Sequence, residues 1–254
     1  MNLKDRVAIV TGGGTGIGRA TSERLAAAGA GAVVVNYSRS ERDAEDTAEA
    51  LRTRGTAART VRADVGDEAA VRAMIDATVA EHGRLDVLVN CAGVTRFIPH
   101  PDLDALTDDV WRAILSTNLM GPFYASRAAG PALRRARGAI VNVSSISGLR
   151  ASGSSLPYAV SKAALLQLTR SLAVALAPEV MVNAVAPGHV VTRWHRDHLG
   201  DEKAAEQARA IAETEPLGRT ASADDVAAAI VSLLTSEMVT GQTIVVDGGK
   251  HLLY

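Results

Sequence analysis

The fold of this chain is decided near its N-terminus, by Val7-Ala8-Ile9-Val10-Thr11-Gly12-Gly13-Gly14-Thr15-Gly16-Ile17-Gly18. The first four residues form a short apolar run that is typical of a buried strand. The glycine-rich part follows directly and opens a helix that we expect over 17–28. Glycines let the backbone turn tightly and approach a ligand, and a helix N-terminus favours a phosphate. The spacing is T-G-x-x-x-G-x-G rather than G-x-G-x-x-G, and its place between strand and helix predicts a loop that binds a dinucleotide.

Strands and helices alternate along the rest of the chain. We expect strands at 7–10, 33–36, 58–61, 86–90, 139–143, 181–186 and 243–246. We expect helices at 17–28, 41–54, 67–81, 107–135 with a bend at Gly121-Pro122, 156–177, 201–213 and 223–235. Apolar strands separated by helices indicate a parallel sheet covered on both faces. Right-handed crossovers then predict an α/β, doubly wound Rossmann fold with a mostly parallel seven-stranded sheet.

The pattern contains no linker, repeat or low-complexity tract, so we expect a single dinucleotide-binding domain over 1–254. The least regular part is the segment at about 188–215. Ligands of such folds bind beyond the carboxyl ends of the strands, so we interpret this segment as a substrate lid. A plain surface excursion is the alternative.

Composition excludes several classes of function. The 254 residues carry a net charge of −1 and only 3% aromatic residues, which argues against a nucleic-acid partner. The single cysteine, Cys91, permits no internal disulfide, and no apolar stretch approaches the roughly 18 to 20 residues of a membrane span. His189, His195 and His198 lack the spacing of a standard ligand set, so we expect no metal site. We therefore expect a cytoplasmic protein with no membrane partner and no signal peptide.

Tyr158 and Lys162 carry the strongest sign of chemistry. They are four residues apart in a predicted helix, so their side chains should project from one face. A nearby ammonium favours a phenolate, which predicts a lowered pKa for Tyr158 and a general acid/base near neutral pH. Decoration of a surface helix is the alternative interpretation of the pair.

These motifs occur together in a fixed order: Thr11-Gly12…Gly16-Ile17-Gly18, Asp64-Val65, Asn90-Cys91-Ala92-Gly93, Asn118, Ser145, Tyr158-x-x-x-Lys162 and Pro187-Gly188. In this order they resemble the short-chain dehydrogenases/reductases, over about residues 4–249. The resemblance implies a catalytic set with separate tasks. Tyr158 exchanges a proton with the substrate oxygen, Ser145 hydrogen-bonds that oxygen, and Lys162 holds the nicotinamide ribose and lowers the Tyr158 pKa. Asn118 holds a water linked to Lys162; bending its own helix by bonding backbone carbonyls is its alternative role.

The resemblance also implies which residues contact the cofactor. They are Gly12, Thr15, Gly16, Ile17, Gly18, Tyr37, Ser38, Arg39, Asp64, Val65, Asn90, Ala92, Gly93, Tyr158, Lys162, Pro187, Gly188, Val190 and Thr192. Within this set Asp64 would accept from the adenine amino group, with a helix N-cap as its alternative role. Asn90 and Gly93 would line the central ribose, whereas we interpret Cys91 as a packing residue.

The position that selects between the two nicotinamide cofactors carries no carboxylate. An acidic residue about 20 positions after the glycines typically holds the ribose 2′-hydroxyl of NAD. Here Tyr37 lies nineteen residues after Gly18, followed by Ser38 and Arg39, and a guanidinium suits a phosphate. We therefore expect NADP(H) to be favoured over NAD(H), although Thr15 stands where many NADP-preferring relatives carry Arg or Lys. A solvent-facing Arg39 is the alternative.

Three functions follow from the resemblance. The first is an NADP(H)-dependent oxidoreductase that interconverts a ketone and a secondary alcohol. Asn90-x-Ala92-Gly93-Val94-Thr95-Arg96 and Gly241-Gln242…Val246-Asp247-Gly248-Gly249 resemble 3-oxoacyl-thioester reductases. The second is a dehydrogenase that oxidises a sugar, steroid or other secondary alcohol, and the third is a non-catalytic dinucleotide-binding scaffold. The helices at 107–135 and 156–177 are apolar on more than one face, so we expect them to pair with a second copy of the chain. The resemblance implies that the assembly is a homotetramer, with a dimer as the alternative.

Overall fold

A computed structural model describes residues 1–253, without the side chains of residues 194–196. Seven strands form one sheet in the order β3-β2-β1-β4-β5-β6-β7, and every neighbouring pair is parallel. The strands are β1 (Val7–Thr11), β2 (Ala32–Tyr37), β3 (Ala57–Arg62), β4 (Val87–Asn90), β5 (Ala139–Val143), β6 (Met181–Pro187) and β7 (Thr243–Val246). The expected doubly wound Rossmann fold is confirmed.

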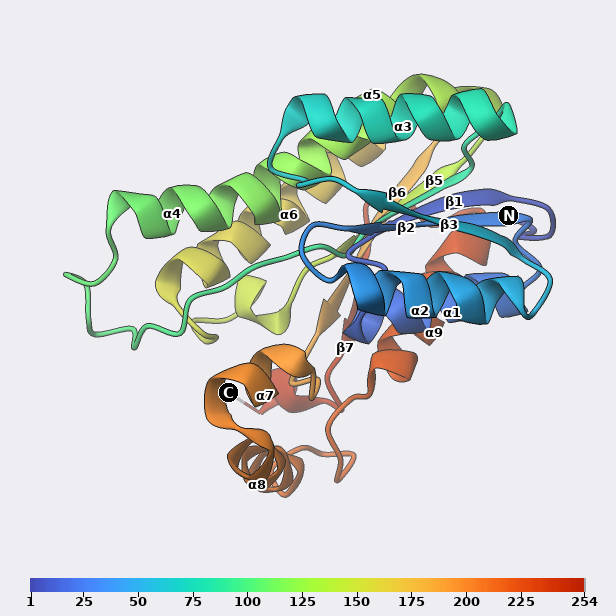
Figure 1. The fold of residues 1–254 in the computed structure, drawn as a ribbon. Coiled ribbons are helices and arrows are strands. Elements are labelled where there is room, and N and C mark those ends of the chain that lie inside the picture. Colours follow the sequence, from blue (N-terminus) through green and yellow to red (C-terminus); the bar gives the residue numbers. More distant parts are fainter. Residues whose placement is uncertain (254) are drawn as a thin grey trace.

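Helices cover both faces of this sheet (Figure 1). They are α1 (Gly16–Ala27), α2 (Glu41–Arg52), α3 (Glu68–His82), α4 (Asp108–Leu115), α5 (Gly121–Ala136), α6 (Leu156–Ala175), α7 (Arg193–Leu199), α8 (Asp201–Ala212) and α9 (Ala223–Thr235). Helices α3 and α5 lie on one side of the sheet, and α1, α2 and α9 lie on the other. No helix in the described part of the chain has the length and apolarity that a membrane span requires.

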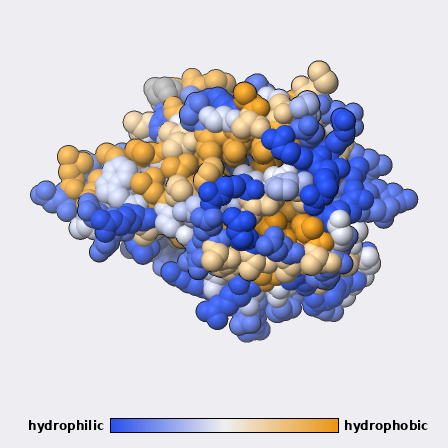
Figure 2. Space-filling model, turned by 90° about the horizontal axis from the view of Figure 1, so that it is seen from above, coloured by the Kyte–Doolittle hydropathy of each residue, from blue (hydrophilic) through white to orange (hydrophobic). Residues whose placement is uncertain are grey.

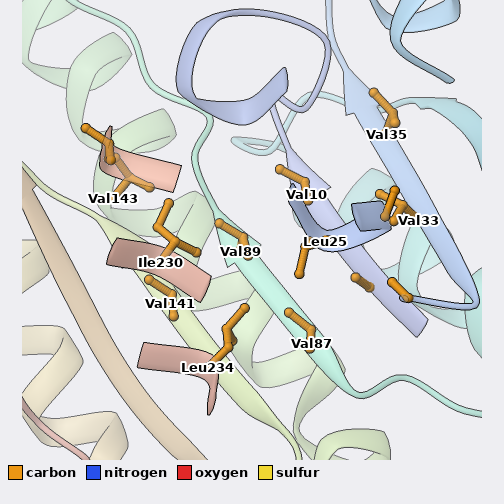
Figure 3. Packing of buried hydrophobic residues seen from close by; sticks show 14 of the residues in the cluster. Val10, Leu25, Val33, Val35, Val87, Val89, Val141, Val143, Ile230 and Leu234 are labelled. Atoms are coloured by element: carbon orange, nitrogen blue, oxygen red, sulfur yellow. The ribbon is translucent and has the colours of Figure 1, made fainter. Parts of the chain in front are cut away.

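Alternation along the strands divides the core in two. In β1, Val10 packs with Leu25 of α1 and Ile230 of α9, as Figure 3 shows from close by. Its neighbour Ile9 packs on the opposite side, in a cluster that includes Met74 of α3. Successive side chains of a strand point to opposite faces, so a strand of Val and Ile residues supplies both layers of the core.

Local signals set the helix ends. Asp67 caps α3 by accepting from the backbone N–H groups of Ala69 and Ala70, at 2.9 and 3.2 Å. Ser222 and Asp225 form a reciprocal capping box at the start of α9. Gly83 ends α3 in the left-handed conformation, with φ of 71°.

Two expectations about helices need correction. The helix expected over 107–135 is divided by a π-helical turn, Ser116–Met120, which ends where the bend at Gly121-Pro122 was expected. Pro122 has no backbone N–H, so the regular hydrogen-bond ladder cannot continue through it. The segment at 188–215 is also more regular than expected, because it contains α7 as well as α8. Figure 1 shows both helices outside the two helix layers, near β7.

The strand order positions the functional site. Strand β1 pairs with β2 on one side and with β4 on the other, so the direction of winding reverses between β1 and β4. In open α/β sheets, ligands bind in the crevice outside the carboxyl ends of the strands at such a point.

Candidate active site and cofactor cleft

A cleft of about 980 Å³ lies at the carboxyl ends of the central strands. This volume is at the upper end of the range for cofactor and small-molecule sites. Its wall includes the glycine loop after β1, the residues that follow β2, the start of α6 and the residues from Pro187 to Arg193. The predicted residues on this wall are Gly12, Thr15, Gly16, Ile17, Tyr37, Ser38, Arg39, Asp64, Val65, Ala92, Gly93, Ser145, Tyr158, Lys162, Pro187, Gly188, Val190 and Thr192.

The glycine loop is packed so closely that a side chain would not fit at several of its positions. Gly12 has φ of +62°, and a Cβ there would lie 3.0 Å from the Cα of Ala92. A Cβ on Gly18 would lie 2.1 Å from the carbonyl oxygen of Gly12. Gly18 is not on the cleft wall, and its lack of a side chain lets α1 pack closely under the loop. The resulting cradle, at the N-terminus of a helix of twelve residues, fits a dinucleotide pyrophosphate.

Two side chains to which the sequence analysis assigned no role fix the position of this loop. The Thr11 hydroxyl oxygen accepts from the backbone N–H groups of Cys91 and Ala92, at 3.0 and 3.1 Å. The Asn36 amide oxygen accepts from Gly12 N at 3.3 Å, while its nitrogen donates to Ala63 O at 3.0 Å. The ends of neighbouring strands are thereby joined. Thr11 and Asn36 could have been found in the sequence, because each is a polar residue at the last or second-last position of an apolar strand.

Asn90 lies apart from most of the other predicted cofactor residues. Its side chain is buried in the sheet, where its amide nitrogen donates to the Asn142 amide oxygen at 2.8 Å, and it does not line the cleft. Asp64 does line the cleft, and its carboxylate accepts from Gly66 N at 2.9 Å. The alternative role of Asp64 as a helix cap is excluded because Asp67 caps α3. Cys91 packs partly buried against the core, and burial raises the pKa of its thiol to about 12, so the thiol stays neutral.

Ser145, Tyr158 and Lys162 meet on one wall of the cleft. Ser145 follows β5, and its hydroxyl oxygen accepts from Ser147 N at 3.1 Å, which fixes the rotamer of the serine. A hydrogen bond joins the Ser145 and Tyr158 side chains. The ammonium nitrogen of Lys162 lies 5.7 Å from the centre of the Tyr158 ring, on the same face of α6. The spacing of four residues thus has the geometry that a helix predicts.

The electrostatics of this group differ from the expectation. Burial raises the pKa of Tyr158 to about 12, and the hydrogen bond from Ser145 only partly opposes the rise. Burial also lowers the pKa of Lys162 to about 8. The predicted lowering of the Tyr158 pKa is therefore wrong for this structure. The cost of desolvating a phenolate dominates, and the Lys162 ammonium is turned toward the Val143 carbonyl oxygen, 2.8 Å away.

Asn118 lies in the π-helical turn, fully buried and outside the cleft wall. Its amide oxygen accepts from Val94 N at 2.8 Å, and its amide nitrogen donates to Val94 O and to Ser161 Oγ, both at 3.0 Å. These bonds engage the side chain, so it does not bond carbonyls of its own helix. Its backbone carbonyl has no regular α-helical donor, because Pro122 stands four residues later without an N–H. The side chain of Asn118, by contrast, is fully engaged within the protein.

His198 is engaged in an aromatic contact. The His198 ring stacks on Phe97, with centroids 3.9 Å apart and planes at 6°. The side chain of His195 lies outside the described residues. Among the side chains that are described, no group of three potential ligands is placed to hold a metal ion.

Comparisons with known proteins agree with this geometry. Residues 12–251 match the family model described as enoyl-(acyl carrier protein) reductase. The chain is 49% identical to "Granaticin polyketide synthase putative ketoacyl reductase 2" of Streptomyces violaceoruber, over 97% of this chain and 96% of the relative. It is 37% identical to the 3-oxoacyl-[acyl-carrier-protein] reductase FabG of Staphylococcus aureus, over 96% of this chain and 98% of the relative. The solved structure of a gluconate 5-dehydrogenase from Burkholderia cenocepacia, in complex with NADP and tartrate, superposes with a TM-score of 0.88. That structure is 34% identical and covers all of this chain and 98% of its own.

Proposed function

The chain belongs to the short-chain dehydrogenase/reductase family of oxidoreductases, and on that premise we propose that it uses NADP(H) to interconvert a ketone and a secondary alcohol. The observation that carries this proposal is the contact between Ser145 and Tyr158 on the cleft wall, with Lys162 beside them. We assign proton transfer to Tyr158, binding of the substrate oxygen to Ser145, and a supporting role to Lys162 and Asn118.

The state of Tyr158 suits it to donate a proton when a ketone is reduced. A nicotinamide cofactor supplies the hydride when it is bound in such a cleft. As the substrate carbonyl becomes an alkoxide, its oxygen needs a hydrogen-bond donor and then a proton. Ser145 provides the first, in the manner of an oxyanion donor, and the Tyr158 hydroxyl, which is protonated at neutral pH, provides the second.

Lys162 is suited to bind ribose hydroxyls. An ammonium has three N–H donors, and the bond to Val143 O occupies one of them. The remaining donors are available to the cofactor at the cleft wall. A water held by the Asn118 carbonyl would connect this site to solvent and return the proton that Tyr158 gives up.

The preference for NADP(H) is supported by the residues after β2. Ser38 and Arg39 are exposed on the cleft wall, and no carboxylate occupies the position of Tyr37. The Tyr37 hydroxyl donates to the Glu41 carboxylate at 2.9 Å, which engages one oxygen of that acid. Arg39 forms no ion pair with any described residue, so its guanidinium is available to a 2′-phosphate.

For the substrate we propose a 3-oxoacyl thioester. Two relatives that match this chain over nearly its whole length carry names of ketoacyl reductases. Oxidation of a sugar-derived alcohol is the second candidate. The structure that superposes on this chain is named a gluconate 5-dehydrogenase, and it was solved with NADP. A non-catalytic scaffold is disfavoured by the presence of both Tyr158 and Lys162 on the cleft wall.

The test is a side-by-side assay of NADPH and NADH oxidation with acetoacetyl-coenzyme A, and of NADP⁺ and NAD⁺ reduction with gluconate. Turnover of the thioester with NADPH preferred supports the proposal. Turnover of gluconate alone favours the second candidate, and binding of cofactor without turnover of either sends the search to other ketones. The variant Tyr158→Phe separates an enzyme from a scaffold. If the protein is an enzyme, this variant keeps tight NADPH binding and loses turnover.

We also propose a homo-oligomer, a tetramer in preference to a dimer, in a cytoplasmic setting. Figure 2 shows apolar residues gathered toward the α4 end of the molecule. On α6, Val174 is 81% exposed and Val160 is 43% exposed. Exposed apolar surface of this kind is typical of contacts between subunits. Light scattering at micromolar concentration tests the proposal, and a monomeric mass contradicts it.

A further inference from the structure

Arg193, the first residue of α7, reaches across the mouth of the cleft to α2. One terminal nitrogen of its guanidinium donates to the Asp43 carboxylate at 2.6 Å, and the other donates to the Ser40 hydroxyl. The two segments are 150 residues apart in the sequence. Arg193, Ser40 and Asp43 all line the cleft. A side chain from the lid segment therefore forms part of the cleft wall that follows β2.

This part of the wall is where a dinucleotide fold distinguishes its cofactors. A carboxylate near the adenosine ribose favours a 2′-hydroxyl and repels a 2′-phosphate. The chain has three carboxylates here, Glu41, Asp43 and Asp197. Tyr37 donates to Glu41, and Arg193 pairs closely with Asp43, at 2.6 Å, and more loosely with Asp197, at 3.9 Å. Without Arg193, Asp43 would lose the one ion pair that it makes with a described side chain, on a wall that also carries Arg39 and Arg42.

We propose that Arg193 is a specificity-determining residue supplied by the lid: by neutralising Asp43 it makes the site beside Arg39 acceptable to a 2′-phosphate. The proposal rests on the proposed function, because it concerns the choice between the two nicotinamide cofactors. It extends that function, because cofactor selection then depends on a residue far outside the loop after β2.

The neighbouring residue links this selection to the position of the lid. Thr192 packs over the glycine loop, since a Cβ on Gly16 would lie 3.4 Å from the Thr192 methyl carbon. Arg193 reaches Asp43 in the conformation in which Thr192 lies against the pyrophosphate cradle. In this conformation the lid presents a paired carboxylate to the 2′-phosphate.

The test measures binding rather than turnover. Dissociation constants for NADPH and NADH are determined by isothermal titration calorimetry on Arg193→Gln, Asp43→Asn and the double variant. Removing Arg193 is expected to weaken NADPH binding about five-fold, the scale of one exposed charge pair, and NADH binding less than two-fold. Asp43→Asn added to Arg193→Gln is expected to restore most of the lost NADPH affinity, because the unpaired anion is gone.

A matched control is Arg24→Gln. Arg24 forms an exposed two-bond pair with Asp224, between α1 and α9 and away from the cleft wall, so its loss should leave both dissociation constants unchanged. Equal weakening of both cofactors in Arg193→Gln overturns the proposal, since the residue then only holds the lid closed. Unchanged binding of both also overturns it.

The readout separates this proposal from the proposed function. If the wild-type protein prefers NADH, the expected cofactor preference fails, yet a further shift of the ratio in Arg193→Gln still supports a selective role for Arg193. If neither dinucleotide binds, the proposed function and this proposal both fail. Circular dichroism of each variant verifies that a lost affinity does not reflect lost folding.

Discussion

The ammonium nitrogen of Lys162 donates a hydrogen bond to the backbone carbonyl oxygen of Val143 at a distance of 2.8 Å. Val143 is the last residue of β5, and Ser144, the next residue, donates from its hydroxyl to the Lys162 carbonyl oxygen at 2.8 Å. The strand end and the helix are therefore joined twice at the level of the catalytic side chains. This arrangement holds Lys162 at the cleft while leaving part of its donor capacity unused.

Replacing Tyr158 by phenylalanine removes the proton donor and keeps the ring. We expect kcat to fall by about 10²- to 10⁴-fold, the range for loss of a general acid. NADPH affinity should change little, because the Lys162 and glycine-loop contacts remain. Steady-state assays and calorimetric binding check the two effects separately. Activity within a factor of ten of wild type would show that another group transfers the proton.

The buried Lys162 makes stability depend on pH in a defined window. Its folded-state pKa, about 8, is below the ordinary value of 10.5, so between these values the unfolded chain binds more protons. Stability should therefore rise as pH increases from about 8 to 10, by roughly 2 kcal/mol. Above pH 10 the raised Tyr158 pKa acts in the opposite direction, because the folded state then holds the extra proton.

Urea unfolding at pH 7.5 and pH 10, in wild type and in Lys162→Met, tests this dependence. Other groups titrate in the same range, so the informative quantity is the difference between the two proteins. The methionine variant should lack the rise. An equal rise in both proteins would assign it to groups other than Lys162.

Gly18→Ala would place a methyl carbon 2.1 Å from the Gly12 carbonyl oxygen, so the backbone must move to admit it. We expect a loss of about 1 to 3 kcal/mol in stability and at least a ten-fold weaker NADPH affinity, because the cradle shifts. Thermal unfolding and calorimetry measure these effects. Gly83→Ala is the control: it has φ of +71° with open space around it, and it should cost about 1 kcal/mol without affecting the cofactor.

Glu215 is buried, at 4% exposure, and neither of its carboxylate oxygens has a hydrogen-bond partner among the described residues. Burial and the nearby Asp247 raise its pKa, against smaller opposing effects of Lys250 and Arg219. A carboxyl group with a raised folded-state pKa stabilises the fold at low pH, and this contribution is lost as pH rises through that pKa.

Glu215→Gln should therefore stabilise the protein at pH 8, by about 1 kcal/mol, and give little gain at pH 5. Chemical unfolding at both pH values measures the difference. Glu213→Gln, at an exposed position two residues earlier, should change stability at neither pH. A gain of equal size at pH 5 and pH 8 would contradict an origin in the ionised carboxylate.

Much of the fold is predictable because the signals are local. The apolar runs at β1 and β5 and the cap at Asp67 each specify an element without reference to distant parts of the chain. The π-helical turn was not predictable in detail: the sequence shows the proline that interrupts the ladder but not how the neighbouring carbonyls rearrange.

The site was less predictable where partners are remote in sequence. Asn90 looks like a cleft residue from its motif, but its orientation depends on Asn142 in the adjacent strand. The pKa of Tyr158 depends on how deeply its hydroxyl is buried, which no spacing reports. Arg193 meets Asp43 only through the folded lid, so no local pattern marks it as part of the cofactor wall.

The two hydrogen bonds between the Asn118 side chain and the Val94 backbone have a practical consequence for redesign of the substrate site. Asn118 binds both backbone groups of Val94 and also binds Ser161, whose hydroxyl donates to the Tyr158 carbonyl oxygen at 2.7 Å. The loop after β4 is thus anchored to the catalytic helix at Val94, and it becomes exposed at Arg96 and Phe97. Library mutagenesis for new substrates can vary the loop beyond that anchor while the proton-transfer geometry is kept, whereas changes at Val94 would spread directly into the backbone that carries Tyr158.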